Sequence, residues 1–63
     1  MIGPGYYVRL RAYGGEEIIR RVVAVKPGVV LVCKDEEYAQ AQREGREPAV
    51  VGFRLEHVIE EQP

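Results

Sequence analysis

The segment Tyr6-Tyr7-Val8-Arg9-Leu10-Arg11-Ala12-Tyr13-Gly14-Gly15 decides the fold. Tyr6, Val8, Leu10 and Ala12 share one face if the segment is extended, and the residues between them share the other. This period of two is typical of a half-buried β-strand. The two glycines predict a tight hairpin turn, because glycine adopts a positive φ without steric cost. The segment therefore predicts the first strand and the first turn of a β-sheet.

Strand signals continue along the chain. The alternation of the second strand breaks at Arg20-Arg21, where we expect a bulge or a sharp bend. Lys26-Pro27-Gly28 predicts a tight turn, because proline presets φ and glycine takes the left-handed position. The remaining predicted elements are strands over 16–25, 29–34, 49–53 and 58–60, with a single helical turn at 55–57 between the last two.

One short helix is predicted over 35–44. Asp35 is expected to cap its first turn, and the acidic residues that follow suit the positive end of the helix dipole. Gly45 is expected to end the helix in a left-handed conformation, and Pro48 prevents its continuation. The helix is too short to be stable alone, so it must pack on the sheet.

Five short strands must bury one face, and an isolated sheet of this size does so poorly. We therefore expect a mainly β fold over residues 1–63, a single domain that forms a small five-stranded barrel with the helix inserted between strands 3 and 4. Residues 51–60 resemble the end of SH3-like barrels, where a helical turn separates the last two strands, and this resemblance implies that the barrel is SH3-like. Residues 8–17 and 28–32 are similar to the first motif of Sm-like proteins, and Val51-Gly52 with Val58-Ile59 to the second. The RNA-binding loop of Sm-like proteins carries Asp and Asn, whereas the matching turn here is Lys26-Pro27-Gly28, so the resemblance implies the barrel and no RNA-contacting residue.

Composition excludes many chemistries. The chain has no Ser, Thr, Asn or Trp, so it lacks a hydroxyl nucleophile of the Ser/Thr kind and cannot form a P-loop. One cysteine and one histidine complete neither an internal disulfide nor a Cys/His zinc site. We expect Cys33 to be a buried small hydrophobe and His57 to be exposed or partly packed. The expectation is a protein that is not an enzyme and uses no cofactor or metal; an enzyme subunit with a site shared across an interface is the remaining catalytic alternative.

The N-terminal residues are neither basic nor part of a long apolar run, and no segment approaches the length needed to span a bilayer. A cytoplasmic location without membrane contact is the expectation.

The two halves of the chain carry net charges of opposite sign. Residues 1–34 carry six basic and two acidic residues, a net charge of +4, and residues 35–63 carry three basic and eight acidic residues, a net charge of −5. Aromatic and guanidinium groups on an exposed strand face stack bases and pair with phosphates, or receive an acidic peptide or the acidic half of another subunit. The aliphatic parts of arginine side chains also often just cover apolar surface, and the acidic pI of about 5.8 argues against strong non-specific DNA binding. The candidate platform comprises Tyr7, Arg9, Arg11, Tyr13, Arg20 and Arg21.

Two segments, 22–25 and 29–33, are apolar on both faces, which is typical of strands covered on both sides. A barrel interior covers only one side, so the remainder predicts an apolar interface. The sequence therefore favours a binding or assembly module that acts by self-association or through a protein partner, with single-stranded RNA or DNA binding as the alternative. The candidate interface comprises Val23, Val25, Val30 and Val32.

Overall fold

The longest strand, β2 (Glu17–Lys26), organises the sheet, because it pairs with β1 (Tyr7–Arg11) along its first half and with β3 (Val29–Cys33) along its second half. The computed structural model describes residues 1–63 and contains five antiparallel strands. The other elements are α1 (Asp35–Glu44), β4 (Val51–Arg54), a 3-10 turn (Leu55–His57) and β5 (Val58–Gln62). The predicted mainly β fold, with one helix after the third strand, is confirmed.

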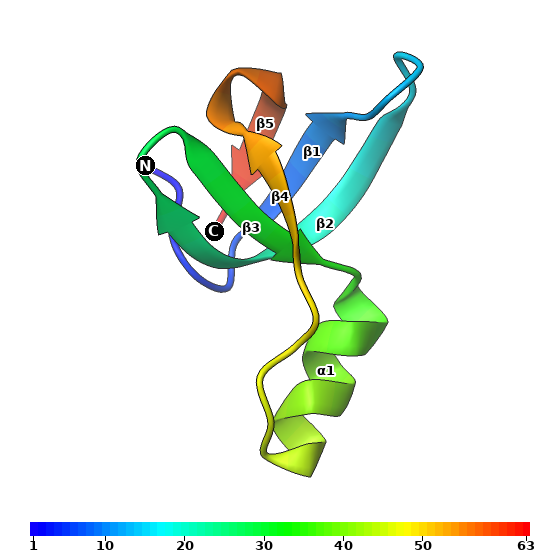
Figure 1. Ribbon diagram of the computed structural model, residues 1–63, viewed down its shortest axis with the longest axis vertical. Coiled ribbons are helices and arrows are strands. Elements are labelled where there is room, and N and C mark those ends of the chain that lie inside the picture. Colours follow the sequence, from blue (N-terminus) through cyan, green and yellow to red (C-terminus); the bar gives the residue numbers. More distant parts are fainter.

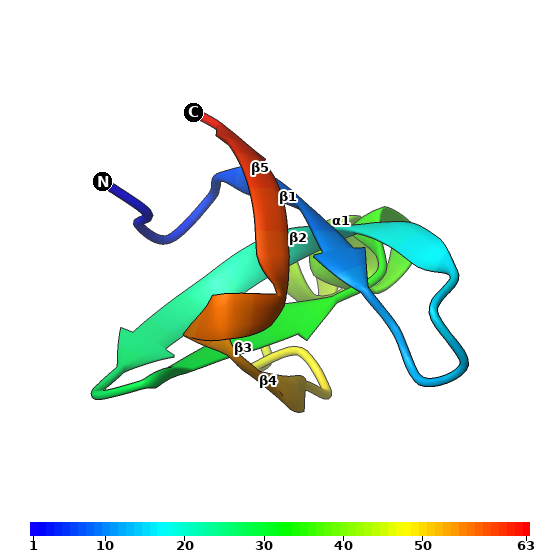
Figure 2. The ribbon, with the colours of Figure 1, turned by 90° about the horizontal axis from the view of Figure 1, so that it is seen from above.

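The strand order is β4-β3-β2-β1-β5, and the sheet bends so that its two halves cross, as Figures 1 and 2 show. The expected closure into a barrel is wrong, since no backbone ladder joins β4 to β5. A closed barrel needs strands long enough to pair while tilted. β4 has four residues and β5 has five, and β5 is paired with β1 over most of its length. The two outer strands therefore remain free edges.

The bend in β2 lies at a bulge, two residues later than predicted. Val22 pairs with Val32 and Ala24 with Leu31, which leaves Val23 as the extra residue. Arg20 and Arg21 do not break the alternation, because they lie opposite Val8 and Tyr7 and so on opposite faces of the sheet. A bulge strengthens local twist, and this one lets β2 serve both halves of the sheet.

The concave inner face holds the core. Its centre consists of five side chains that are at most 1% exposed: Val8, Leu10, Val22, Val30 and Val32. The inward alternation predicted for Val8 and Leu10 is confirmed. Six partly buried residues surround this centre, namely Ile2, Tyr6, Ile18, Phe53, Leu55 and Val58.

Helix α1 projects from one end of the sheet (Figure 1) and buries Ala41. Gly45 ends it as predicted, with φ of 68°, and the Arg46 N–H donates to the Ala41 carbonyl at 3.0 Å. The capping role predicted for Asp35 is wrong. The N-cap is Lys34, without a side-chain cap, and the Asp35 carboxylate instead accepts hydrogen bonds from side chains of the sheet.

An ionic cluster fixes the loop that returns the chain from α1 to β4. Arg46 donates to Glu37 Oε2 at 2.7 Å and to Glu44 Oε1 at 2.6 Å. The Ala49 N–H also donates to Glu37 Oε2, at 2.9 Å. The hydrogen bonds from Arg46 and then Ala49 lower the pKa of Glu37 from 4.5 to about 2. Glu37 thereby ties the helix to the residue that leads into β4.

This cluster makes folding stability pH-dependent. Because the pKa of Glu37 is lower in the folded state, its contribution is complete above pH 4.5 and is lost as the pH falls towards 2. Thermal unfolding followed by circular dichroism should therefore show Glu37→Gln melting below the wild type at pH 7, with the difference vanishing near pH 2. Glu36→Gln, which removes an exposed carboxylate without an ion pair, is the matched control and should follow the wild type. A constant difference between Glu37→Gln and the wild type at every pH would contradict the assignment.

Candidate functional site

The structure divides the predicted platform between three places. Tyr7, Arg9 and Arg21 lie together on the outer face of β1 and β2, with Arg11 further along β1. Arg20 points to the inner face, opposite Val8. Tyr13 lies beyond β1 in the hairpin loop and is fully exposed. The six residues therefore do not form one continuous surface.

Arg21 binds the helix to the sheet. Its guanidinium carbon lies 4.4 Å from the ring centroid of Tyr7 and 4.5 Å from that of Tyr38 in α1. Arg21 Nη1 donates to Asp35 Oδ1 at 2.9 Å and also to the Tyr7 hydroxyl, which itself donates to Asp35 Oδ1 at 3.1 Å. The Arg21 side chain is 24% exposed, and its Nε is buried without a hydrogen-bond partner. Tyr7 and Arg21 are thus occupied within the chain.

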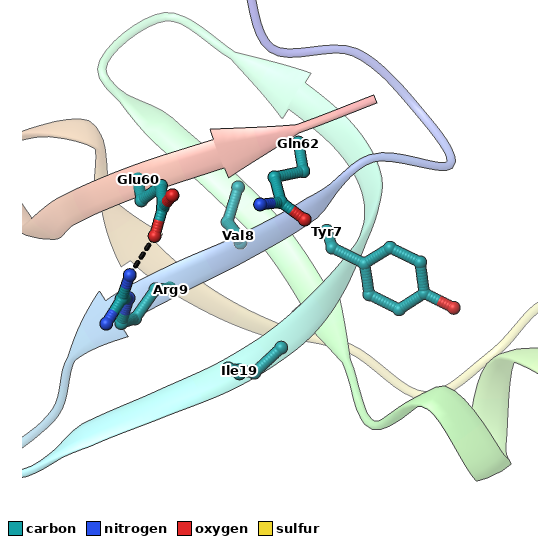
Figure 3. A pocket seen from close by; sticks show the side chains of 6 residues that line it. All are labelled: Tyr7, Val8, Arg9, Ile19, Glu60 and Gln62. Carbon is teal, nitrogen blue, oxygen red and sulfur yellow. Dashed lines mark hydrogen bonds and ion pairs between the residues drawn. The ribbon is translucent and has the colours of Figure 1, made fainter.

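Arg9 is also neutralised within the chain. It forms an ion pair with Glu60 of β5, as Figure 3 shows, and lies 3.6 Å from Glu17. Arg9 and Glu60 line a shallow pocket of about 260 Å³ on the outer face, together with Ile19, which is 64% exposed. Two carboxylates against one guanidinium disfavour an incoming phosphate or carboxylate at this pocket. Of the arginines on the predicted platform, only Arg11 and Arg20 have no carboxylate partner.

The predicted apolar interface needs correction. Val30 and Val32 are core residues that are 0% and 1% exposed, so neither can contact a partner. The outward positions of β3 are Val29 and Leu31, which are half-buried. Of the other two predicted residues, Val23 is half-buried at the bulge and Val25 is 40% exposed near the end of β2.

The structure places exposed apolar residues at the edge of the sheet instead. Val50 and Val51 are 39% and 61% exposed, where the chain enters the edge strand β4, which pairs with β3 on one side only. Val51 borders a mostly apolar groove of about 340 Å³, which Ile18, Val32 and Phe53 also line. Three charged side chains, Arg20, Lys34 and Glu37, also line this groove; Arg20 and Lys34 make no ion pair, whereas Glu37 is held by Arg46. This site was not predicted from the sequence, although 49–51 is apolar on both faces like the two segments chosen for the predicted interface.

The two residues considered for reactivity are unremarkable in their surroundings. Cys33 is 6% exposed, and burial followed by the nearby Glu37 and Asp35 carboxylates raises the pKa of its thiol. A raised pKa leaves little thiolate at neutral pH. The His57 side chain is 47% exposed beside Glu56, with 4.0 Å between Nε2 and Oε1. No group of three or more His, Cys, Asp or Glu side chains is placed to hold a metal ion.

Comparison of the chain with protein-family models, with curated proteins and with solved structures finds no match. None of its helices has the length and apolar character required to cross a bilayer.

The different surroundings of two platform arginines can be measured. Arg21→Ala removes two ring contacts and a charged hydrogen bond, so we expect the free energy of unfolding to fall by about 1–3 kcal/mol. Arg11→Ala removes an exposed side chain without an ion pair and should change it by less than about 0.5 kcal/mol. Urea titration of both variants checks this. Equal losses in the two variants would contradict the structural role of Arg21.

Proposed function

We propose that this chain is an assembly module whose free β4 edge accepts a strand from a second copy of the same chain. The observation that carries the proposal is Val51, an apolar side chain that is 61% exposed on a strand with one unpaired side. An exposed edge strand presents a row of free N–H and C=O groups, which is a template for pairing with another chain. Most proteins protect such an edge with charges or proline, whereas here the strand begins with the exposed Val51 and its one charged residue, Arg54, is at its other end.

The groove beside β4 supports the same proposal. Ile18, Val32 and Phe53 line it together with Val51, and it lies on the open side of the bent sheet. A strand added to β4 would extend the sheet over this opening and cover Val51. Fully burying a valine side chain contributes about 1.5–3 kcal/mol, so this contact adds to the backbone hydrogen bonds that the new strand would make.

Charge favours β5 of the second copy as the added strand. The groove carries Arg20 and Lys34, which make no ion pair, and Glu37, which is held by Arg46, whereas β5 carries Glu60 and Glu61, whose partners within the chain are Arg9 and the N-terminal amino group. Pairing β4 with a second β4 would instead bring Arg20 and Lys34 of one copy near those of the other, where like charges repel. β5 is also a free edge, and its Ile59 is 42% exposed. Pairing β4 with β5 is a head-to-tail contact, which gives a ring if the rotation closes.

A single substitution at each edge tests the proposal. Light scattering of the wild type at high micromolar concentration should give a mass above that of one chain. Val51→Lys and Ile59→Lys should each lower the mass to that of one chain, because lysine on an edge strand opposes pairing. Ile19→Lys is the matched control, since Ile19 is 64% exposed on the outer face of β2, which is not an edge strand, and it should assemble like the wild type.

Mixing the two edge variants tests the head-to-tail order. Each variant keeps one intact edge, so an equal mixture of Val51→Lys and Ile59→Lys should form a complex of two chains, while each variant alone stays single. A wild-type mass equal to one chain would overturn the assembly proposal. Loss of assembly in Val51→Lys but not in Ile59→Lys would overturn the choice of β5.

A further inference from the structure

A second pocket lies between the loop that joins β1 to β2 and the segment where β4 enters the 3-10 turn. Its volume is about 380 Å³, and its lining includes Arg11, Tyr13, Phe53, Arg54 and His57. Phe53 packs against the core and is half-buried, so the pocket has an apolar side next to its charged groups. This pocket shares only Phe53 with the groove at Val51.

The pocket has more cationic than anionic groups. Arg11 makes no ion pair, in contrast to Arg9, two positions earlier on the same strand. Arg54 Nη1 and His57 Nε2 lie 3.6 Å and 4.0 Å from the same oxygen of Glu56. The single Glu56 carboxylate therefore faces two side chains. Because these contacts are long and exposed to solvent, they contribute little to stability. The guanidinium groups of Arg11 and Arg54 remain available to an incoming anion.

Tyr13 places an aromatic ring at the same pocket. It is 101% exposed, and the glycines that follow it have φ of 88° and 85°. Residues with side chains rarely adopt these values, so the turn geometry depends on Gly14 and Gly15. The exposed Tyr13 ring does not contribute to packing of the core. Tyrosine rings are enriched at binding surfaces because they combine a large apolar face with a polar end.

We infer that this pocket binds an acidic peptide. One of its carboxylates would accept hydrogen bonds from Arg11 and Arg54, and an adjacent apolar or aromatic side chain would pack between Tyr13 and Phe53. Bidentate pairing of guanidinium with carboxylate supplies both energy and geometric selectivity. The inference does not depend on assembly at the β4 edge.

The surroundings of the pocket favour a short peptide over a nucleic acid. A polynucleotide needs cations along its path, because it carries a phosphate at every residue. Beyond Arg11, the neighbouring groups of β1 and β2 are Arg9, already paired with Glu60, and Glu17. Along the outer face of β1 and β2 the cationic surface therefore does not continue beyond Arg11, which suits a ligand with one or two carboxylates.

Nuclear magnetic resonance titration of the full chain tests the inference. The probe is an acetylated Glu-Tyr-Glu-Tyr peptide, and a short oligothymidylate is titrated in parallel. We expect the peptide to shift the backbone amide signals of residues 11–16 and 52–57 and to saturate. The double variant Arg11→Glu/Arg54→Glu should weaken this binding about tenfold or more, which corresponds to losing a hydrogen bond to a charged group.

Two further variants keep the test decisive. Arg43→Glu reverses an exposed charge without an ion pair on α1 and should leave peptide binding unchanged. Tyr13→Ala removes a fully exposed ring, so the fold is retained even if the double variant fails to fold, and peptide binding should weaken. The inference is overturned if no signals shift at millimolar peptide, if Arg43→Glu weakens binding as much as the double variant, or if oligothymidylate binds the same residues more tightly than the peptide.

Discussion

The bend at the bulge in β2 is the constraint on which the rest of the structure depends. Only five side chains are fully buried at the centre of the core, and they come from three strands. A flat sheet would leave them in water, because the chain has no second layer large enough to cover its inner face. By adding one residue at Val23, β2 turns far enough to bring Val8 and Leu10 of β1 against Val30 and Val32 of β3.

The same bend explains why the sheet has two free edges with different chemistry. The sheet folds over on itself at β2, but its outermost strands are too short to meet and pair. β5 carries Glu60 and Glu61, which are held by Arg9 and by the N-terminal amino group. β4 begins with Val51, which follows Val50, and these side chains are 61% and 39% exposed. An edge with charged side chains resists indiscriminate pairing, whereas an apolar edge invites it, so the two strands are suited to different roles in a contact between copies.

Sequence reasoning worked where the pattern is local. The alternation from Tyr6 to Ala12 predicted the inward positions of β1, and Gly45 predicted the end of α1, because both signals depend on neighbouring residues. It failed where a pattern has no alternation: 29–33 is apolar at every position, so the sequence could not decide whether Val29 or Val30 faces inward. That choice is set by the register with β2 and by its bulge.

Ion pairs between residues distant in the sequence could not be predicted from local patterns either. Arg9 and Glu60 are 51 residues apart, and Arg21 and Asp35 are 14 apart in different elements. The acidic groups that these pairs use come from the second half of the chain and the basic groups from the first. Basic residues of the first half therefore pair with acidic residues of the second half within the fold. These contacts attach α1 and β5 to the central strands.

What the fold leaves unpaired is more informative than the net charge of either half. Arg20 and Lys34 remain beside the apolar groove at β4, and Arg11 remains beside Tyr13 at the second pocket. Each set of unpaired cations adjoins exposed apolar or aromatic surface and makes no ion pair within the chain; the one carboxylate that lines the groove, that of Glu37, is held by Arg46. An ion pair formed within a small fold stabilises that fold. The cations that remain unpaired next to apolar surface therefore mark the places where an acidic partner would bind most favourably.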